Sequence, residues 1–176
     1  MKTQSEFKLT PQAGIALVET LVALALLLII IVGVMAMTMT AIATTENQGH
    51  LAARTAEYAQ DKMEQLLALT YGDITSDTTV FPSANSGGTG LKVGGSVDPS
   101  APVNQYVDYL DASGNLLTSA GGAPAGWFYI RVWKIENPVG TTNLERISVL
   151  AQTKSDVGPQ GAIPNSTIVA LKSNPF

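Results

Sequence analysis

Few residues of this chain have side chains that could do chemistry. Its 176 residues include no cysteine and a single histidine, His50, to which we assign no role. The lack of cysteine excludes disulfides, thiolate nucleophiles and cysteine-bound zinc or iron–sulfur centres, and one histidine cannot build a histidine-rich metal site. The glycine pairs at 87–88 and 94–95 are not followed by the Lys-Ser/Thr that completes a phosphate-binding loop. We therefore predict that the chain is not an enzyme and has no cofactor.

One pattern places oxygen-bearing side chains at alternate positions: Asp111, Ser113 and Asn115. Alternate oxygen ligands resemble a fragment of a calcium-binding loop. No glutamate follows at the distance where such a loop supplies its bidentate ligand. Asx-rich segments also form ordinary hairpin turns, and the pattern favours that interpretation. These three residues are therefore the one candidate metal site, and a structural turn is the preferred alternative.

The carboxylate of Glu19 stands at the start of a long apolar segment. No charged residue occurs from Thr20 to Thr45, and Leu21–Met37 is apolar apart from Gly33. About 20 such residues are enough for a helix to cross a bilayer. A carboxylate just inside the bilayer costs about 2.5–3.5 kcal/mol and usually has a partner. Without a nearby cation on its own helix, Glu19 either reaches the membrane surface or pairs with another group, such as an α-amine created by cleavage before Ile15.

The charges that flank the apolar segment predict its orientation. Lys2 and Lys8 precede it, and the next basic residue is Arg54. The positive-inside rule leaves the N-terminus in the cytoplasm and exports everything after about residue 45. The segment is longer than the roughly 7–15 apolar residues of a secretory signal, and Ala41–Ala43 matches a cleavage site only weakly. An uncleaved signal anchor is the simplest interpretation of these facts alone.

The stretch from Gly14 to Met37 resembles the prepilin signal of type IV pilins and type II secretion pseudopilins. In that family a basic leader ends in Gly, a prepilin peptidase cleaves after it, the new N-terminal residue is N-methylated, and a Glu stands fifth in the mature chain. The resemblance implies cleavage between Gly14 and Ile15 and N-methylation of Ile15. It also implies that Glu19 sets the assembly register by pairing with the Ile15 ammonium of a neighbouring subunit. Ile15 replaces the family's commonest residue, Phe, and Ala36 replaces a frequent Pro, so a proline kink is not expected.

An amphipathic helix is expected to follow the apolar segment and to end near residues 71–73. Apolar residues recur every three or four positions, with charged residues on the opposite face. The apolar side consists of Ala52, Ala56, Ala59, Met63, Leu66 and Leu67. We expect this stripe, rich in small residues, to pack closely against a sheet.

The remaining residues predict a long loop and an antiparallel sheet. Residues 72–102 are rich in Gly, Ser, Thr, Asp and Pro, which is typical of a surface loop. Three or four strands are expected in residues 103–176, at 103–110, 127–135, 144–153 and 166–172. Trp127 and Trp133 share strand parity with Tyr129, which favours core packing over an exposed patch for contacts with other pilins.

These elements predict a pilin-like α+β protein. Its parts are a prepilin leader at 1–14, a transmembrane and assembly helix at 15–45, and an exported domain at 46–176, in which a helix packs on a small antiparallel sheet. With a net charge of −4, the chain has no surplus of positive charge to neutralise nucleic-acid phosphates, so no nucleic-acid binding is expected.

The resemblance implies a structural subunit of a type IV pilus-like fibre, most like a minor pilin of the PilV type. Its partners would be other pilins, the prepilin peptidase and an inner-membrane assembly platform. The subunit would cross the inner membrane once before assembly and lie in a pilus, or in a periplasmic pseudopilus, afterwards. Two alternatives stay open: a minor pseudopilin of a type II secretion system, and an uncleaved single-span anchor for an exported binding domain.

Overall fold

The computed structural model describes residues 12–119, 121–141, 143–154 and 163–174, except for the side chains of 12–15, 44 and 47. The chain divides into two compact units, Met1–Thr45 and Glu46–Phe176. A single α-helix, α1 (Gln12–Ala68), supplies the described part of the first unit and the first element of the second. Most of the leader expected at 1–14 lies outside the described residues.

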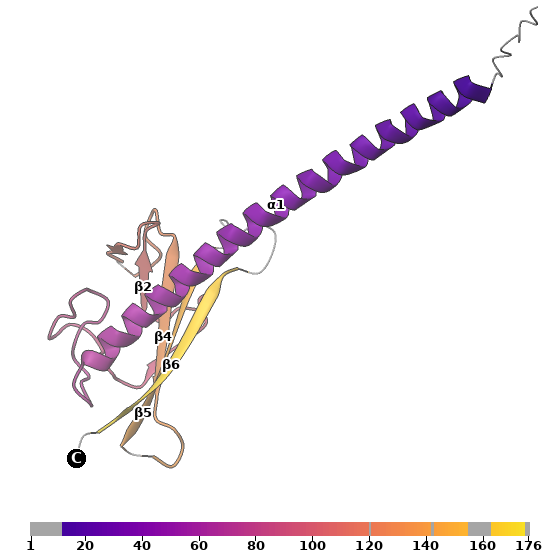
Figure 1. The fold of residues 1–176 in the computed structure, drawn as a ribbon. Helices are drawn as coiled ribbons and strands as arrows, with labels where there is room; N and C mark the ends of the chain where they lie inside the picture. The colour runs from indigo at the N-terminus through magenta and orange to yellow at the C-terminus, as the bar shows by residue number, and fades with distance from the viewer. Residues whose placement is uncertain (1–11, 120, 142, 155–162, 175–176) are drawn as a thin grey trace, which may run out of the picture. The chain divides into compact units, whose positions relative to one another are not determined.

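The second unit is built on a six-stranded antiparallel sheet (Figure 1). Its strands are β1 (Gly94–Gly95), β2 (Val107–Leu110), β3 (Leu116–Leu117), β4 (Tyr129–Glu136), β5 (Leu144–Thr153) and β6 (Asn165–Ser173). The order across the sheet is β3-β2-β4-β5-β6, and β1 pairs with β4. The α+β class is therefore confirmed. The sheet has six strands where three or four were expected, because β1 and β3 are two residues long and too short to show a periodic pattern.

The three longest strands, β4, β5 and β6, are neighbours in the sheet, and β6 forms one of its edges. In the β4–β5 hairpin, Trp133 lies opposite Val149 and Ile135 lies opposite Ile147. Buried residues alternate with more exposed ones along β5, as expected for a strand with one face on the core. The sequence-predicted strand at 144–153 matches β5 from end to end, whereas the one predicted at 103–110 begins four residues late, at Val107.

The C-terminal part of α1 covers one face of this sheet, and the main core lies between them (Figure 1). From the helix come Tyr58, Ala59, Met63 and Leu66, and from the sheet come Tyr129, Trp133, Ile135, Ile147, Val149 and Ala151. Burying this apolar area holds the helix to the sheet at roughly 25 cal/mol per Å² removed from water. The outer face of the sheet carries a smaller cluster around Tyr109, Ile130 and Val132.

The face of α1 that meets the sheet matches the expected stripe in part, because Ala59, Met63 and Leu66 are in the core. Ala52, Ala56 and Leu67 are exposed, whereas Thr55 and Lys62 are completely buried. The packed face therefore includes two polar residues, Thr55 and Lys62, which lie two helical turns apart. A search for apolar residues alone does not identify them. Thr55 is accommodated because its hydroxyl contacts the Ser166 hydroxyl on β6 at 3.0 Å.

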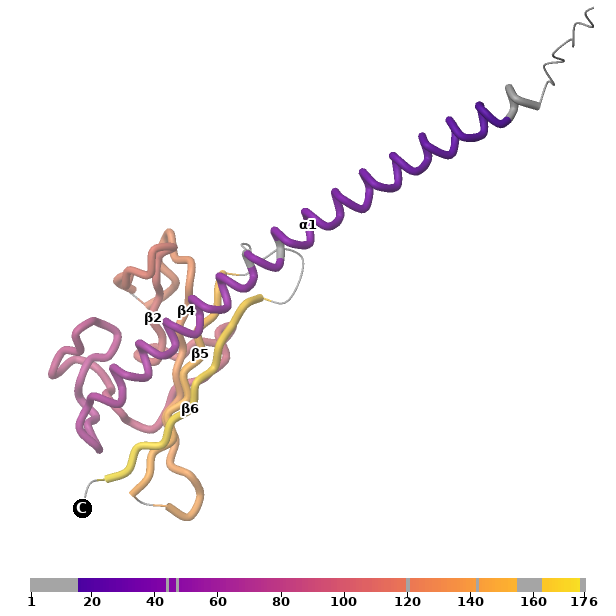
Figure 2. The backbone as a smooth tube through the Cα atoms, viewed as in Figure 1, coloured from indigo at the N-terminus to yellow at the C-terminus, as the bar shows by residue number. Residues whose placement is uncertain are grey.

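Residues 72–102 form more than the surface loop expected from their composition. The segment curls around the C-terminal end of α1 (Figure 2) and contains β1, a bridge between Asp77 and Ala84, and the buried residues Thr78 and Leu91. Gly95 shows why glycines occur here: its φ is +82°, and a Cβ would overlap the carbonyl oxygen of Trp133. A side chain at this position would prevent β1 from approaching β4.

Candidate functional site: the apolar helix segment and a buried charge cluster

The N-terminal part of α1 presents an apolar surface. Large apolar side chains from Leu17 to Ile42 are exposed, with exposed fractions from 49 to 78%. The helix is long and apolar enough to cross a membrane, judged on length and composition. The carboxylate of Glu19 is exposed on this segment. The described chain thus has one helix suited to a bilayer or to a bundle of similar helices, with one acidic side chain near its start.

Threonine hydroxyls within the apolar segment donate hydrogen bonds to backbone carbonyls of the same helix. Thr38 and Thr45 donate hydrogen bonds to the carbonyls of Val34 and Ala41, one helical turn earlier, at 2.8 Å each. Thr20 donates in the same way to the carbonyl of Leu17 at 2.9 Å. Such internal bonds let a hydroxyl enter an apolar environment without an unpaired donor. Glu19 is different, because a carboxylate has no proton to donate to the backbone when it is ionised.

The residues implied by the prepilin resemblance all lie near the start of α1. Gly14 and Ile15 fall within the helical backbone, which begins at Gln12, and their side chains are outside the description. Glu19 is four positions after Ile15, a rise of about 6 Å along the helix axis. Nothing in the structure tests the cleavage, the methylation or the pairing of Glu19, which stay predictions.

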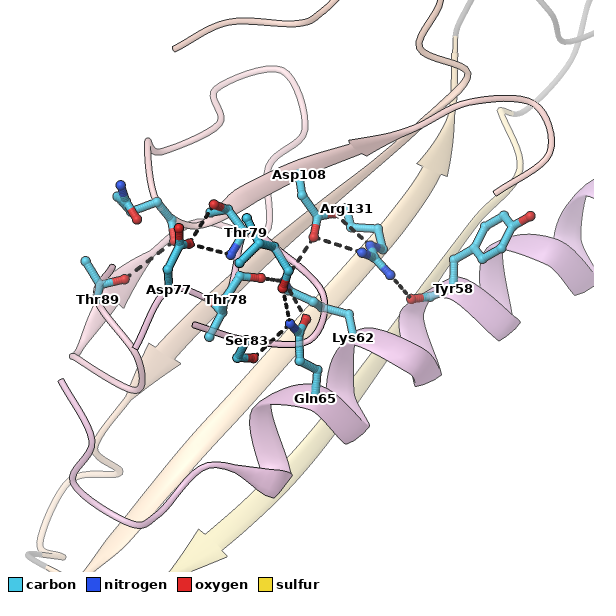
Figure 3. Close-up of polar contacts among 12 residues, drawn as sticks. Tyr58, Lys62, Gln65, Asp77, Thr78, Thr79, Ser83, Thr89, Asp108 and Arg131 are labelled. Atoms are coloured by element: carbon cyan, nitrogen blue, oxygen red, sulfur yellow. Dashed lines mark hydrogen bonds and ion pairs between the residues drawn. The ribbon is translucent and has the colours of Figure 1, made fainter. Parts of the chain in front are cut away.

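A buried charge cluster joins α1 to the sheet in the second unit (Figure 3). It consists of Lys62 on α1, Asp108 on β2 and Arg131 on β4. Lys62 Nζ lies 2.9 Å from Asp108 Oδ2. Arg131 approaches the same carboxylate with both Nε (2.7 Å to Oδ1) and its second terminal nitrogen (2.9 Å to Oδ2). One carboxylate thus binds two cations and connects three elements that are distant in the sequence.

Lys62 and Arg131 also donate hydrogen bonds to groups other than Asp108. Lys62 Nζ donates to the carbonyl of Thr78 and, at 2.9 Å, to the side-chain oxygen of Gln65. It lies 3.9 Å from the centre of the Trp133 ring, within range of a cation–π interaction. Arg131 donates to the carbonyl of Tyr58 at 3.4 Å. The ammonium therefore also fixes the loop at Thr78 against the helix.

Burial and charge shift the pKa values of the cluster in opposite senses. Burial lowers the pKa of Lys62 to about 8, because desolvation disfavours the ammonium and outweighs the attraction of Asp108. Burial by itself would raise the pKa of Asp108, but the charges of Lys62 and Arg131 outweigh it and hold that pKa below the ordinary value. Asp108 is thus held ionised by two cations, and the Lys62 ammonium loses its proton at a lower pH than an ordinary lysine does.

A second lysine completes the C-terminal end of α1. Lys172 on β6 donates from Nζ to the carbonyl of Leu67 at 2.7 Å and to that of Leu69. The last turn of the helix has no basic residue of its own. A cation at this end satisfies free carbonyls and complements the negative end of the helix dipole. The sheet therefore supplies a carboxylate, Asp108, that binds the buried Lys62 of α1, and a lysine, Lys172, that caps the C-terminal end of the same helix.

The candidate calcium residues form a turn between β2 and β3. Asp111 Oδ1 accepts hydrogen bonds from the backbone N–H groups of Ser113 (2.8 Å) and Asn115 (2.9 Å), and Oδ2 accepts one from the Asn115 amide at 2.9 Å. These bonds, led by the one from the Asn115 side chain, lower the pKa of Asp111. Both carboxylate oxygens thus accept hydrogen bonds from the turn itself, which is an Asx turn. Among the described residues, no group of three or more His, Asp or Glu side chains could hold a metal ion.

The two tryptophans lie on different sides of the sheet. Trp133 is fully buried in the main core with Tyr129, as their shared parity predicts. Trp127 precedes β4, which begins at Tyr129, so strand parity does not reach it. It packs in the outer cluster, edge-on to Tyr109 with ring centres 5.7 Å apart. Core packing is confirmed for Trp133, and the predicted common face for the two tryptophans is wrong.

Reasoning from the sequence did not find the buried charge cluster. Lys62 stands between charged residues of α1, and neither Asp108 nor Arg131 follows a motif. One available signal is that Asp108 and Arg131 both occur in strands rich in apolar and aromatic residues, where an isolated charge requires a partner.

Comparison with known proteins identified no matching family model, curated protein or solved structure. The structure itself defines an α+β protein with one N-terminal helix that is apolar enough to span a membrane.

Proposed function

We propose that this chain is a structural subunit, a minor pilin, of a type IV pilus-like fibre. In this proposal the N-terminal part of α1 anchors the subunit in the inner membrane and afterwards packs against equivalent helices in the fibre. The observation that carries the proposal is the exposed carboxylate of Glu19 at the start of an exposed apolar helix segment. An apolar bundle penalises an unpaired carboxylate, so a partner cation is needed there.

The new α-amine at Ile15 is the partner that fits. Cleavage after Gly14 creates an ammonium without adding any residue to the apolar segment. An ammonium and a carboxylate in an apolar bundle interact far more strongly than on a surface in water. Because the pair forms only at one axial offset between neighbours, it also selects one register. The helix then needs no other polar side chain to specify how subunits stack.

The second unit supports this proposal by folding around its own core. The main apolar core and the buried charge cluster use residues of Glu46–Phe176 alone. A domain with its own core can be exported while the preceding helix stays in the membrane. The same property fits an uncleaved anchor that carries an exported binding domain, so processing is the deciding measurement.

The test is to express the full chain with and without a prepilin peptidase and to analyse the product by intact mass and N-terminal peptide mapping. We expect a mature protein that begins with N-methylated Ile15 only when the peptidase is present. Gly14→Leu should block cleavage, and Gly33→Leu is the matched control that should leave it unchanged, because Gly33 lies inside the segment with open space around it. A protein that keeps Met1–Gly14 in the presence of an active peptidase would show an uncleaved anchor instead.

A further inference from the structure

A pocket opens on the second unit beside the buried charge cluster, and Asp108 of that cluster is one of its lining residues. It has a volume of about 570 Å³, within the range of small-molecule sites. Its walls come from four places: the loop at 77–81, the segment at 102–109, strand β3, and the described residues on either side of position 120, which are Thr118, Ser119, Gly121 and Gly122. Neither the pilin proposal nor the sequence patterns assign this pocket a role.

The chemistry of the wall is polar but not cationic. Hydroxyl, amide and carboxylate groups are contributed by Asp77, Thr79, Asn104, Gln105, Thr118 and Ser119. Among the described residues that line the pocket there is no Lys, Arg or His. A phosphate, sulfate or carboxylate ligand would find no counter-ion there and would face the Asp77 carboxylate. The wall instead offers acceptors and hydroxyls that suit a ligand rich in hydroxyl donors.

Gln105 is the most unusual residue of this wall. It is the one described non-glycine residue with a positive φ, +70°. Its side-chain oxygen is buried and has no hydrogen-bond partner among the described residues. Folding alone would favour pairing that acceptor and relaxing that backbone. Rotation of the Gln105 side chain would bring this oxygen to the pocket surface, where a ligand hydroxyl would supply the missing donor.

An exposed aromatic ring stands at the edge of the same pocket. The side chain of Phe81 is 78% exposed, yet its loop is held in place. Gln65 on α1 donates to the carbonyl of Val80 at 2.6 Å and to the Ser83 hydroxyl at 2.9 Å (Figure 3). Asp77 and Ala84 close the base of the loop with two backbone hydrogen bonds, of 2.8 and 3.1 Å. A positioned aromatic face beside a polar wall matches a ligand with one apolar face and hydroxyls at its edge.

We propose that this pocket, the Phe81 pocket, binds a neutral saccharide. A sugar ring combines an apolar C–H face, which stacks on Phe81, with hydroxyls that donate to Gln105 Oε1 and to the Asp77 carboxylate. Asp77 Oδ1 already accepts from Thr79, and no hydrogen bond to Oδ2 is recorded among the described residues. A second hollow of about 630 Å³ shares Phe81 and Leu116 with the first, so an oligosaccharide can extend past the ring. That hollow adds the carboxylates of Asp61 and Glu64 and one cation, the Arg131 guanidinium, which already binds Asp108.

The experiment uses the full chain in a detergent without sugar, lauryldimethylamine oxide, on an array of oligosaccharides. The array contains neutral chains of hexoses and N-acetylhexosamines, together with sialylated and sulfated chains. The strongest neutral saccharide is then titrated by calorimetry. We expect binding to neutral chains and none that depends on an acidic group.

Two variants with matched controls connect the binding to the pocket. Phe81→Ala should weaken the affinity roughly tenfold or more, and Val139→Ala, at a fully exposed apolar position outside the pocket, should leave it within about twofold. Gln105→Asn should weaken binding roughly fivefold while keeping the fold, since Asn tolerates a left-handed backbone. Gln152→Asn on β5 is its control. Circular dichroism and the urea midpoint verify that each variant is folded.

Three results would overturn the proposal. The first is an array on which no neutral saccharide binds. The second is binding restricted to acidic chains, or binding of an oligolysine peptide in place of any saccharide, either of which would indicate a charge-driven surface. The third is an unchanged affinity for folded Phe81→Ala. Because none of these measurements depends on cleavage at Gly14, the saccharide site can fail while the pilin proposal holds, and the reverse.

Discussion

Lys62 Nζ lies 2.9 Å from Asp108 Oδ2, and the side chains of both residues are almost fully removed from water. Arg131 binds the same carboxylate, so the cluster contains two cations and one anion. The helix and the sheet are therefore joined by charge as well as by apolar packing. Because both cations bind the Asp108 carboxylate, we expect its removal to lower the free energy of unfolding more than the removal of Lys62 does.

We expect Asp108→Asn to destabilise the second unit by about 3–5 kcal/mol, because two buried cations lose the carboxylate that both of them bind. Lys62→Met should cost less, about 1–3 kcal/mol, because Asp108 keeps both hydrogen bonds from Arg131 and the apolar chain of Met fills most of the space. Urea unfolding of the full chain, followed by tryptophan fluorescence, measures both, since Trp133 lies beside Lys62. Lys134→Met removes a half-exposed surface ion pair and should cost under about 1 kcal/mol. An Asp108→Asn variant as stable as Lys62→Met would contradict the unequal roles.

The lowered pKa of Lys62 predicts a stability that rises with pH on the alkaline side. The folded-state pKa is about 8 and the unfolded one is near 10.5, so between these values the unfolded chain binds more protons. Stability should therefore increase by about 2 kcal/mol from pH 7 to 9.5, as the cluster changes from two cations and one anion to a neutral Asp108–Arg131 pair. Lys62→Met should lack this rise. Equal pH profiles for the two proteins, from urea midpoints at each pH, would show that Lys62 does not titrate in this range.

A side chain at Gly114, in the turn between β2 and β3, should destabilise the second unit by steric overlap. The φ of Gly114 is +87°, and a Cβ there would overlap the Tyr58 hydroxyl on α1. Gly140 has a similar φ of +84° but open space around it, so Gly140→Ala measures the backbone cost alone, about 1 kcal/mol. We expect Gly114→Ala to cost about 1–3 kcal/mol more than Gly140→Ala. Adding Tyr58→Phe should recover part of that excess, because the overlapping oxygen is removed; no recovery in the double variant would place the cost elsewhere.

Glu19 distinguishes assembly from anchoring. Glu19→Ala should insert into the membrane at least as well as the natural chain, since an acidic side chain is removed from the apolar segment. In the proposed fibre its incorporation should fall, because the Ile15 ammonium that cleavage would create on the neighbour is left unpaired, a loss of about 3–5 kcal/mol. Glu19→Gln should lie between the two, and Glu46→Ala, outside the apolar segment, is the control. The measurement is the ratio of sheared-fibre to membrane protein in a strain that expresses partner pilins. An unchanged ratio for Glu19→Ala would favour a simple anchored domain.

The sequence by itself determined the features that depend on composition along a continuous stretch. The uncharged run from Thr20 to Thr45 predicts a helix long enough to cross a membrane, because length and apolarity alone decide that property. The alternation of β5 predicts its bounds and its buried face, because a strand's side chains alternate between faces. Trp133 in the core follows from the same rule.

Only the tertiary structure decided which face of α1 is buried and which side chains form sites. A lone lysine in a helix is expected to be solvated, and Lys62 is buried because Asp108, Arg131 and Thr78 converge on it from separate elements. The buried face of α1 keeps Ala59, Met63 and Leu66 of the expected stripe, whereas Ala52 and Ala56 are exposed. The Phe81 pocket has the same origin, since its walls come from four segments that no local pattern connects. Local spacing determines secondary structure, whereas charge pairing and cavities depend on contacts between residues far apart in the chain.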